Sequence, residues 1–132
     1  MVSGSRSTTV TVVVADDQAD LRRVLGLALR LDGRFDVVGE AADAAGAVRL
    51  AGTLRPAVMV LDLGMPDVSG LDAIPHIRRV SPGTKILVYS AWAASRAADE
   101  AISLGADLYV EKEEGIQHVI RALAALSGLE GG

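Results

Sequence analysis

The chain has 132 residues, 50% of them hydrophobic, and a formal net charge of −4 at pH 7. This length predicts one domain, and because only 3% of the residues are aromatic, we expect its core to be built from Val, Leu, Ile and Ala. The acidic balance argues against nucleic-acid binding by this segment, and the lack of cysteine excludes a disulfide framework and a thiol nucleophile. No apolar stretch approaches the roughly 18 residues of a membrane span. These properties predict a soluble, cytoplasmic domain that does not bind membranes.

Strand-like and helix-like segments alternate five times along the chain. The first predicted strand is the Val-rich run 9–15, which ends in Asp16-Asp17. The first helix is predicted from apolar residues at helical spacing: Leu21, Val24, Leu25, Ala28 and Leu29. Asp32-Gly33 ends this helix, and 35–41 is predicted as the second strand. An Ala-rich second helix is predicted at 44–54, with an inner face of Ala47, Val48, Ala51 and Leu54.

The second half of the chain continues the alternation. Strands are predicted at 58–62, 85–90 and 108–110, and helices at 71–80, 95–104 and 116–126. Gly105 stands where the C-terminal cap of a helix belongs. The ends, 1–8 and 127–132, are predicted to be a flexible N-terminal tail and a C-terminal tail or linker stub around a domain at 9–126.

Five β-α units in this length predict an α/β fold, a doubly wound five-stranded parallel sheet with helices on both faces. Periodicity does not determine the strand order, and we expect the flavodoxin-like order 2-1-3-4-5. That order places a crevice between strands 1 and 3, at their carboxyl ends. Asp16, Asp17 and Asp62 would then face one another across this crevice.

Three converging carboxylates repel one another unless a cation lies among them. Taken alone, Asp16 and Asp17 are equally well explained as helix-capping and turn-forming residues. Together with Asp62, which follows the most apolar strand, they predict a site for Mg²⁺ or Mn²⁺, because these ions prefer oxygen ligands.

A hydroxyl and an ammonium follow two further strands. Ser90 ends the fourth strand and Lys112 follows the fifth, and either residue alone has an ordinary structural explanation. In combination they would supply a hydrogen bond and a positive charge to a phosphoryl group, and Asp62 would be its nucleophile. The order of these residues predicts a phosphorylation switch.

The ordered set of motifs resembles the receiver domain of bacterial two-component response regulators. The resemblance covers about residues 9–126 and is carried by Asp16-Asp17, Leu61-Asp62-Leu63-Gly64-Met65-Pro66, Ser90-Ala91, Tyr109 and Lys112. It implies that Asp62 accepts a phosphoryl group from a sensor histidine kinase or phosphotransfer protein, and that Lys112 holds this group.

The resemblance also implies further roles for these residues. Asp17, Asp62 and the Gly64 carbonyl would ligate Mg²⁺, with Asp16 acting through water, and Ser90 and Tyr109 would form a switch pair. The acyl phosphate would be removed by self-catalysed hydrolysis. The output surface would be the face of the fourth helix, fifth strand and fifth helix, available for a homodimer or an effector.

Two positions depart from the common receiver pattern. Many receivers carry Pro directly after this Lys, whereas here Glu113 follows, so we expect a trans bond and a more flexible loop before the last helix. Receivers attached to helix-turn-helix effectors often lack this Pro, and the motifs of this chain look most like that subgroup. Trp92, two residues past Ser90, either lies with Ala91 at the edge of the site or packs on the surface of the fourth helix.

Two other kinds of protein compete with this interpretation. One is an atypical receiver that binds partners without phosphorylation. The other is a phosphatase of the haloacid-dehalogenase type, which needs a second Asp two residues after the nucleophile, where this chain has Gly64. No enzymatic activity on a diffusible substrate is expected, and no DNA-binding domain fits within 132 residues.

Overall fold

The computed structural model describes residues 9–129, so the predicted N-terminal tail and the last three residues lie outside the described part. The strands are β1 (Val10–Ala15), β2 (Phe35–Ala41), β3 (Val58–Leu61), β4 (Lys85–Ser90) and β5 (Leu108–Glu111). The helices are α1 (Ala19–Asp32), α2 (Ala44–Leu54), α3 (Gly70–Val80), α4 (Ala94–Leu104), the short 3₁₀ turn η2 (Lys112–Glu114) and α5 (Ile116–Leu126).

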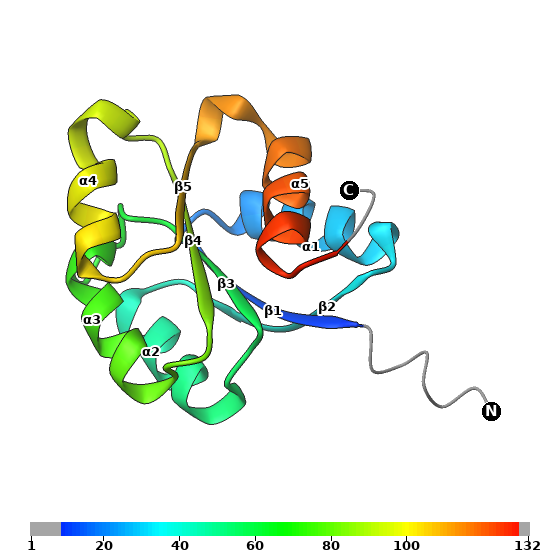
Figure 1. Cartoon of the computed structure of the whole chain (residues 1–132), viewed down its shortest axis with the longest axis horizontal. Helices are drawn as coiled ribbons and strands as arrows, with labels where there is room; N and C mark the ends of the chain where they lie inside the picture. The colour runs from blue at the N-terminus through cyan, green and yellow to red at the C-terminus, as the bar shows by residue number, and fades with distance from the viewer. Residues whose placement is uncertain (1–8, 130–132) are drawn as a thin grey trace.

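The strands form one parallel sheet in the order β2-β1-β3-β4-β5, which confirms the predicted fold class and strand order. Helices α1 and α5 cover one face of the sheet, and α2, α3 and α4 cover the other (Figure 1). None of the helices in the part of the chain that the structure describes has the length and apolarity needed to cross a membrane.

Two apolar cores lie on the two faces of the sheet, because neighbouring residues of a strand point to opposite sides. In β1, Val13 and Ala15 belong to the core under α2, α3 and α4. Val12 and Val14 belong to the core under α1 and α5. Burial on both faces explains why β1, β3 and β4 are nearly continuous apolar runs.

The predicted helix ends agree with the structure. Gly33 ends α1 with a φ of 88°, and Gly105 follows α4 with a φ of 125°, a region that favours glycine. Two residues of the predicted inner faces are wrong, since Val24 is 53% exposed and Leu54 is 40% exposed. Helical periodicity identified the apolar stripe, but neighbouring elements cover only part of its width.

The carboxyl ends of β1, β3, β4 and β5 lie at one edge of the sheet. Four segments emerge from this edge: Asp16-Asp17, Asp62, Ser90 to Trp92, and Lys112. Residues that are far apart in the sequence are therefore brought together, as expected for an open parallel sheet.

Candidate functional site

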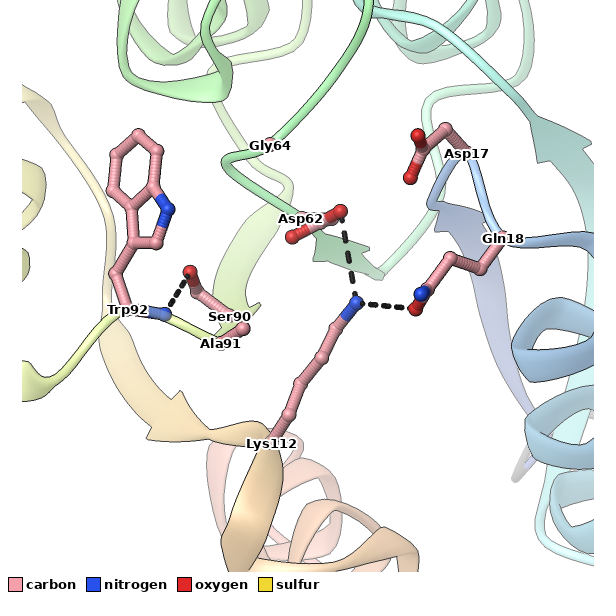
Figure 2. A pocket seen from close by; sticks show the side chains of 8 residues that line it. All are labelled: Asp17, Gln18, Asp62, Gly64, Ser90, Ala91, Trp92 and Lys112. Atoms are coloured by element: carbon pink, nitrogen blue, oxygen red, sulfur yellow. Dashed lines mark hydrogen bonds and ion pairs between the residues drawn. The ribbon is translucent and has the colours of Figure 1, made fainter.

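A pocket of about 350 Å³ opens at this edge of the sheet. Figure 2 shows Asp62 at its centre, Asp17 and Gln18 on one side and Ser90 and Trp92 on the other, with Lys112 reaching in from the end of β5. Its complete lining is Asp17, Gln18, Asp62, Gly64, Ser90, Ala91, Trp92 and Lys112.

Three carboxylates lie together here. Asp16, Asp17 and Asp62 each offer an oxygen within 4.8 Å of the others, and Asp16 and Asp62 are only 3% and 5% exposed. Burial raises the pKa of the Asp62 carboxyl above its usual value, and the nearby Asp16 carboxylate raises it further. The Lys112 ammonium opposes this rise. The site is therefore strongly negative in a poorly solvated setting.

The Lys112 ammonium lies between two of these carboxylates. Its Nζ is 2.8 Å from Asp16 Oδ2 and 3.6 Å from Asp62 Oδ2. It also donates to Gln18 Oε1 at 3.1 Å (Figure 2). Lys112 is thus bound more closely to Asp16 than to Asp62, and a group attached to Asp62 would have to attract it away.

The donor set fits a hard divalent cation. When the three carboxylates are ionised, the single ammonium beside them leaves two negative charges without compensation. Carboxylate oxygens are the ligands that Mg²⁺ and Mn²⁺ prefer. An acidic triad of this kind is typical of the magnesium site of receiver domains.

Ser90 and Tyr109 both contact the backbone of Trp92. The Ser90 hydroxyl, 1% exposed, accepts a hydrogen bond from the Trp92 N–H at 3.0 Å. The Tyr109 hydroxyl donates to the Trp92 carbonyl at 2.8 Å. The Trp92 ring lines the pocket and also lies 5.0 Å from the Arg96 guanidinium on α4. The residue at the pocket edge is therefore linked to both predicted switch residues.

The turn that follows Lys112 is closed by its own side chains. The Glu114 carboxylate accepts from the Glu111 N–H at 2.8 Å, and Gly115 N–H donates to the Lys112 carbonyl at 3.1 Å. The Glu111 carboxylate in turn accepts from the N–H of Ala94, the first residue of α4. The bond between Lys112 and Glu113 is trans, as expected. The predicted extra flexibility of this turn stays a prediction.

The structure adds residues that the sequence analysis missed. Gln18 lines the pocket and binds Lys112, and Arg22 on α1 donates to the Asp16 carbonyl at 2.6 Å. Asp67, in the loop after β3, accepts hydrogen bonds from the first two N–H groups of α2. Gln18 directly follows Asp16-Asp17 in the sequence, so its position beside the site could have been predicted. No sequence pattern pairs Asp67 with a helix more than 20 residues away.

Comparison with known proteins identifies the family. The family model described as the response regulator receiver domain matches residues 12–124, nearly the whole described chain. The chain therefore belongs to the receiver-domain family of two-component response regulators.

Individual relatives agree with this assignment. The chain is 37% identical to the probable transcriptional regulatory protein TcrX of Mycobacterium tuberculosis over 89% of its own length and 49% of that protein. It is 34% identical to the chemotaxis protein CheY of Thermotoga maritima, covering 88% of the chain and 96% of the relative. The signal receiver domain of the response regulator NarL from M. tuberculosis superposes with a TM-score of 0.85 at 31% identity, covering 91% and 97% of the two chains.

The relatives also define the subgroup. The most similar proteins and structures include receivers of LuxR/NarL-type helix-turn-helix response regulators, as the motifs predicted. The chain spans about half the length of several curated relatives that it matches, for example 49% and 55%. Other relatives, such as the T. maritima CheY, are matched along almost their whole length.

Proposed function

We propose that this protein is a phosphorylation-dependent switch in which Asp62 accepts a phosphoryl group from a sensor histidine kinase or phosphotransfer protein in the cytoplasm. The observation that carries the proposal is the convergence of Asp62 with two further carboxylates, Asp16 and Asp17, at the pocket that Lys112 and Ser90 also line. A carboxylate that stands alone would be a turn residue, whereas this combination matches the needs of phosphoryl transfer.

The cation site consists of Asp17, Asp62 and the Gly64 carbonyl, with Asp16 contributing through water. A bound Mg²⁺ would neutralise negative charge on the phosphoryl oxygens during transfer. The chain's own residues bring the reacting atoms together. An oxygen of the Asp62 carboxylate attacks phosphorus, and the bond from phosphorus to the donor's nitrogen breaks.

Lys112 and Ser90 bind the transferred group. Its charge draws the Lys112 ammonium, now 2.8 Å from Asp16, toward Asp62. The Ser90 hydroxyl turns from the Trp92 N–H to donate to a phosphoryl oxygen. Later attack of water on phosphorus breaks the bond to Asp62 and restores the carboxylate, so the switch resets itself.

The output follows from the contacts of Trp92. Movement of Ser90 alters the β4–α4 loop, which Tyr109 also holds through the Trp92 carbonyl. Glu111 connects the end of β5 to the start of α4. Phosphorylation therefore changes the face formed by α4, β5 and α5, and this face binds a second copy or an effector.

The first test is chemical. With acetyl phosphate or phosphoramidate and Mg²⁺, the intact mass should rise by one phosphoryl group. Asp62→Asn should block this increase, whereas Lys112→Ala should keep some labelling and lose the surface change. A wild-type protein that is not labelled would contradict the proposal and favour the alternative, a receiver that binds partners without phosphorylation. If Asp62→Asn is labelled as fully as wild type, Asp62 is not the acceptor.

The second test uses Trp92, the single tryptophan of the chain. Beryllofluoride, a stable phosphoryl mimic, should change its fluorescence when added with Mg²⁺, because Trp92 lines the pocket and accepts from Tyr109. The change should vanish in Asp62→Asn and shrink in Ser90→Ala. A constant spectrum while calorimetry reports binding would remove Trp92 from the switch and leave the acceptor assignment intact.

A further inference from the structure

Asp67 joins the loop between β3 and α3 to a different helix. Its carboxylate accepts hydrogen bonds from the backbone N–H of Ala44 at 2.9 Å and of Ala45 at 3.0 Å, the first two residues of α2. The same loop starts at the candidate acceptor Asp62 and carries the candidate cation ligand Gly64. One side chain therefore connects the backbone of the site to α2.

The base of this loop is held by contacts that do not involve Asp67. Leu63 is fully buried, and the Gly70 N–H donates to its carbonyl at 2.9 Å. A Cβ at Gly70 would lie 2.4 Å from the Asp62 carbonyl oxygen, so the two ends of the loop are in close contact. Among the hydrogen bonds of the described residues, those of Asp67 are the ones that join the tip of the loop to another helix.

The contact is charge-assisted, and Asp67 makes it at an exposed position. Two donors at the positive end of a helix dipole stabilise the ionised carboxylate and lower the pKa of Asp67 to about 2. The carboxylate is therefore ionised at neutral pH, and the tip of the loop is held on α2 under the conditions in which the switch works.

We propose that Asp67 is a positioning residue for the cation site: by holding the β3–α3 loop on the N-terminus of α2, it keeps the Gly64 carbonyl beside Asp62 and raises the affinity for a divalent cation. The inference rests on the proposed function, in which Gly64 is a ligand. A carbonyl is a neutral ligand and attracts a cation less strongly than a carboxylate does. Its contribution to the cation affinity is therefore larger when the loop already holds it in position before the cation binds. Met65, beside Gly64, is buried in the core, so loss of the Asp67 hydrogen bonds would remove part of that preorganisation.

The coupling must act in both directions. If the Asp67 contact strengthens cation binding, then cation binding strengthens the Asp67 contact by the same factor. Mg²⁺ should therefore slow hydrogen exchange of the Ala44 and Ala45 amides, which bind Asp67, in the wild-type protein.

The chain offers a matched control at the same helix end. Asp43 accepts from the Gly46 N–H at 2.8 Å and also caps α2, but it belongs to the segment between β2 and α2. Asp43→Ala and Asp67→Ala both remove a carboxylate cap from one helix. Only Asp67→Ala also removes the hydrogen bonds that join the loop carrying Gly64 to α2.

The experiment is a Mg²⁺ titration of wild type, Asp67→Ala, Asp67→Asn and Asp43→Ala by calorimetry, with Trp92 fluorescence as a second signal. Asp67→Ala should bind Mg²⁺ about tenfold more weakly, the lower end of the range for outer-shell partners. Asp67→Asn, which keeps one acceptor oxygen, should fall between wild type and Asp67→Ala. Asp43→Ala should stay within about twofold of wild type, because the loop is untouched.

Each outcome has a separate meaning. Equal affinity in wild type and Asp67→Ala overturns the inference while leaving the cation site in place. An equal loss in Asp43→Ala also overturns it, because helix capping would then explain the effect. If Asp67→Ala does not fold, hydrogen exchange of the wild-type protein decides. Exchange rates of the Ala44 and Ala45 amides that do not change on addition of Mg²⁺ would contradict the inference. A wild-type protein that does not bind Mg²⁺ refutes the proposed function, and the inference falls with it.

Discussion

At the amino edge of the sheet, where the strands begin, polar side chains such as Thr84 and Arg78 have hydrogen-bond partners, whereas at the carboxyl edge three carboxylates lie together and the Lys112 ammonium pairs with two of them. Before β4, the buried Thr84 hydroxyl donates to the Pro56 carbonyl at 2.7 Å and lies 2.6 Å from the Ser81 hydroxyl. At the other edge, the pKa of Asp62 is raised by burial and by Asp16. The polar groups at the amino edge are therefore paired by hydrogen bonds, whereas the carboxyl edge keeps negative charge that Lys112 does not fully compensate.

Arg78 makes several of the hydrogen bonds at the amino edge. Its guanidinium donates to four groups: the carbonyls of Gly105, Pro82 and Thr84 and the carboxylate of Asp107. Asp107 also accepts from the Ile86 N–H at 2.8 Å. These bonds join α3 to the turns that enter β4 and β5. The Arg78 hydrogen-bond network and the candidate phosphorylation site therefore lie at opposite ends of the same strands.

The greatest loss of stability is expected when the hydrogen bonds of Arg78 at the amino edge are removed. Arg78→Ala should lower the free energy of unfolding by about 3 kcal/mol, because hydrogen bonds to a charged group are lost and Asp107 loses its counter-charge. Chemical denaturation measures this change. The Mg²⁺ affinity should not change, since no Arg78 partner lines the pocket.

A neighbouring residue serves as the control. Arg79 is exposed and contacts only His76 among the hydrogen bonds of the described residues. Arg79→Ala should alter stability by less than about 0.5 kcal/mol. A matching loss of Mg²⁺ affinity in Arg78→Ala would contradict the separation of the two edges.

The second prediction concerns the carboxyl edge. Mg²⁺ at ten times its dissociation constant should raise the free energy of unfolding by about 1.4 kcal/mol, by mass action. Asp17→Asn should abolish that gain and leave the metal-free protein as stable or more stable, because a repulsion between carboxylates is removed. Thermal melting with and without millimolar Mg²⁺ measures both effects. No shift for the wild-type protein would show that this edge does not hold the cation.

The smallest effect at the carboxyl edge concerns Asp67, whose carboxylate accepts hydrogen bonds from the Ala44 and Ala45 N–H groups. Its pKa is lowered from 3.8 to about 2, so the folded state holds its proton more weakly than the unfolded state. The stability that it contributes is present above pH 3.8 and is lost as the pH falls toward about 2.

Melting temperatures across this pH range check the prediction. Wild type should exceed Asp67→Asn at pH 5, and the difference should shrink as the pH approaches 2. A difference that does not depend on pH would mean that the carboxylate charge is not what holds the loop on α2.

Much of the fold was predictable because its signals are local. The ends of α1 and α4 follow from Gly33 and Gly105, whose positive φ values favour glycine. The meeting of Asp16, Asp17 and Asp62 also followed, since the carboxyl ends of parallel strands share one edge. Val24 was wrongly placed inside, because the apolar stripe of α1 is wider than the surface that covers it.

The alternation of strands and helices along the chain, the family, and the residue types that follow each strand could all be read from the sequence. Three contacts became visible in the folded structure alone: Lys112 pairs more closely with Asp16 than with Asp62, Gln18 accepts a hydrogen bond from the Lys112 ammonium, and Asp67 caps α2. The difference lies in the sequence distance over which each kind of interaction acts. Periodicity and turn chemistry act over a few residues, whereas these contacts join segments 22 to 96 residues apart and exist only after the sheet has aligned its strands.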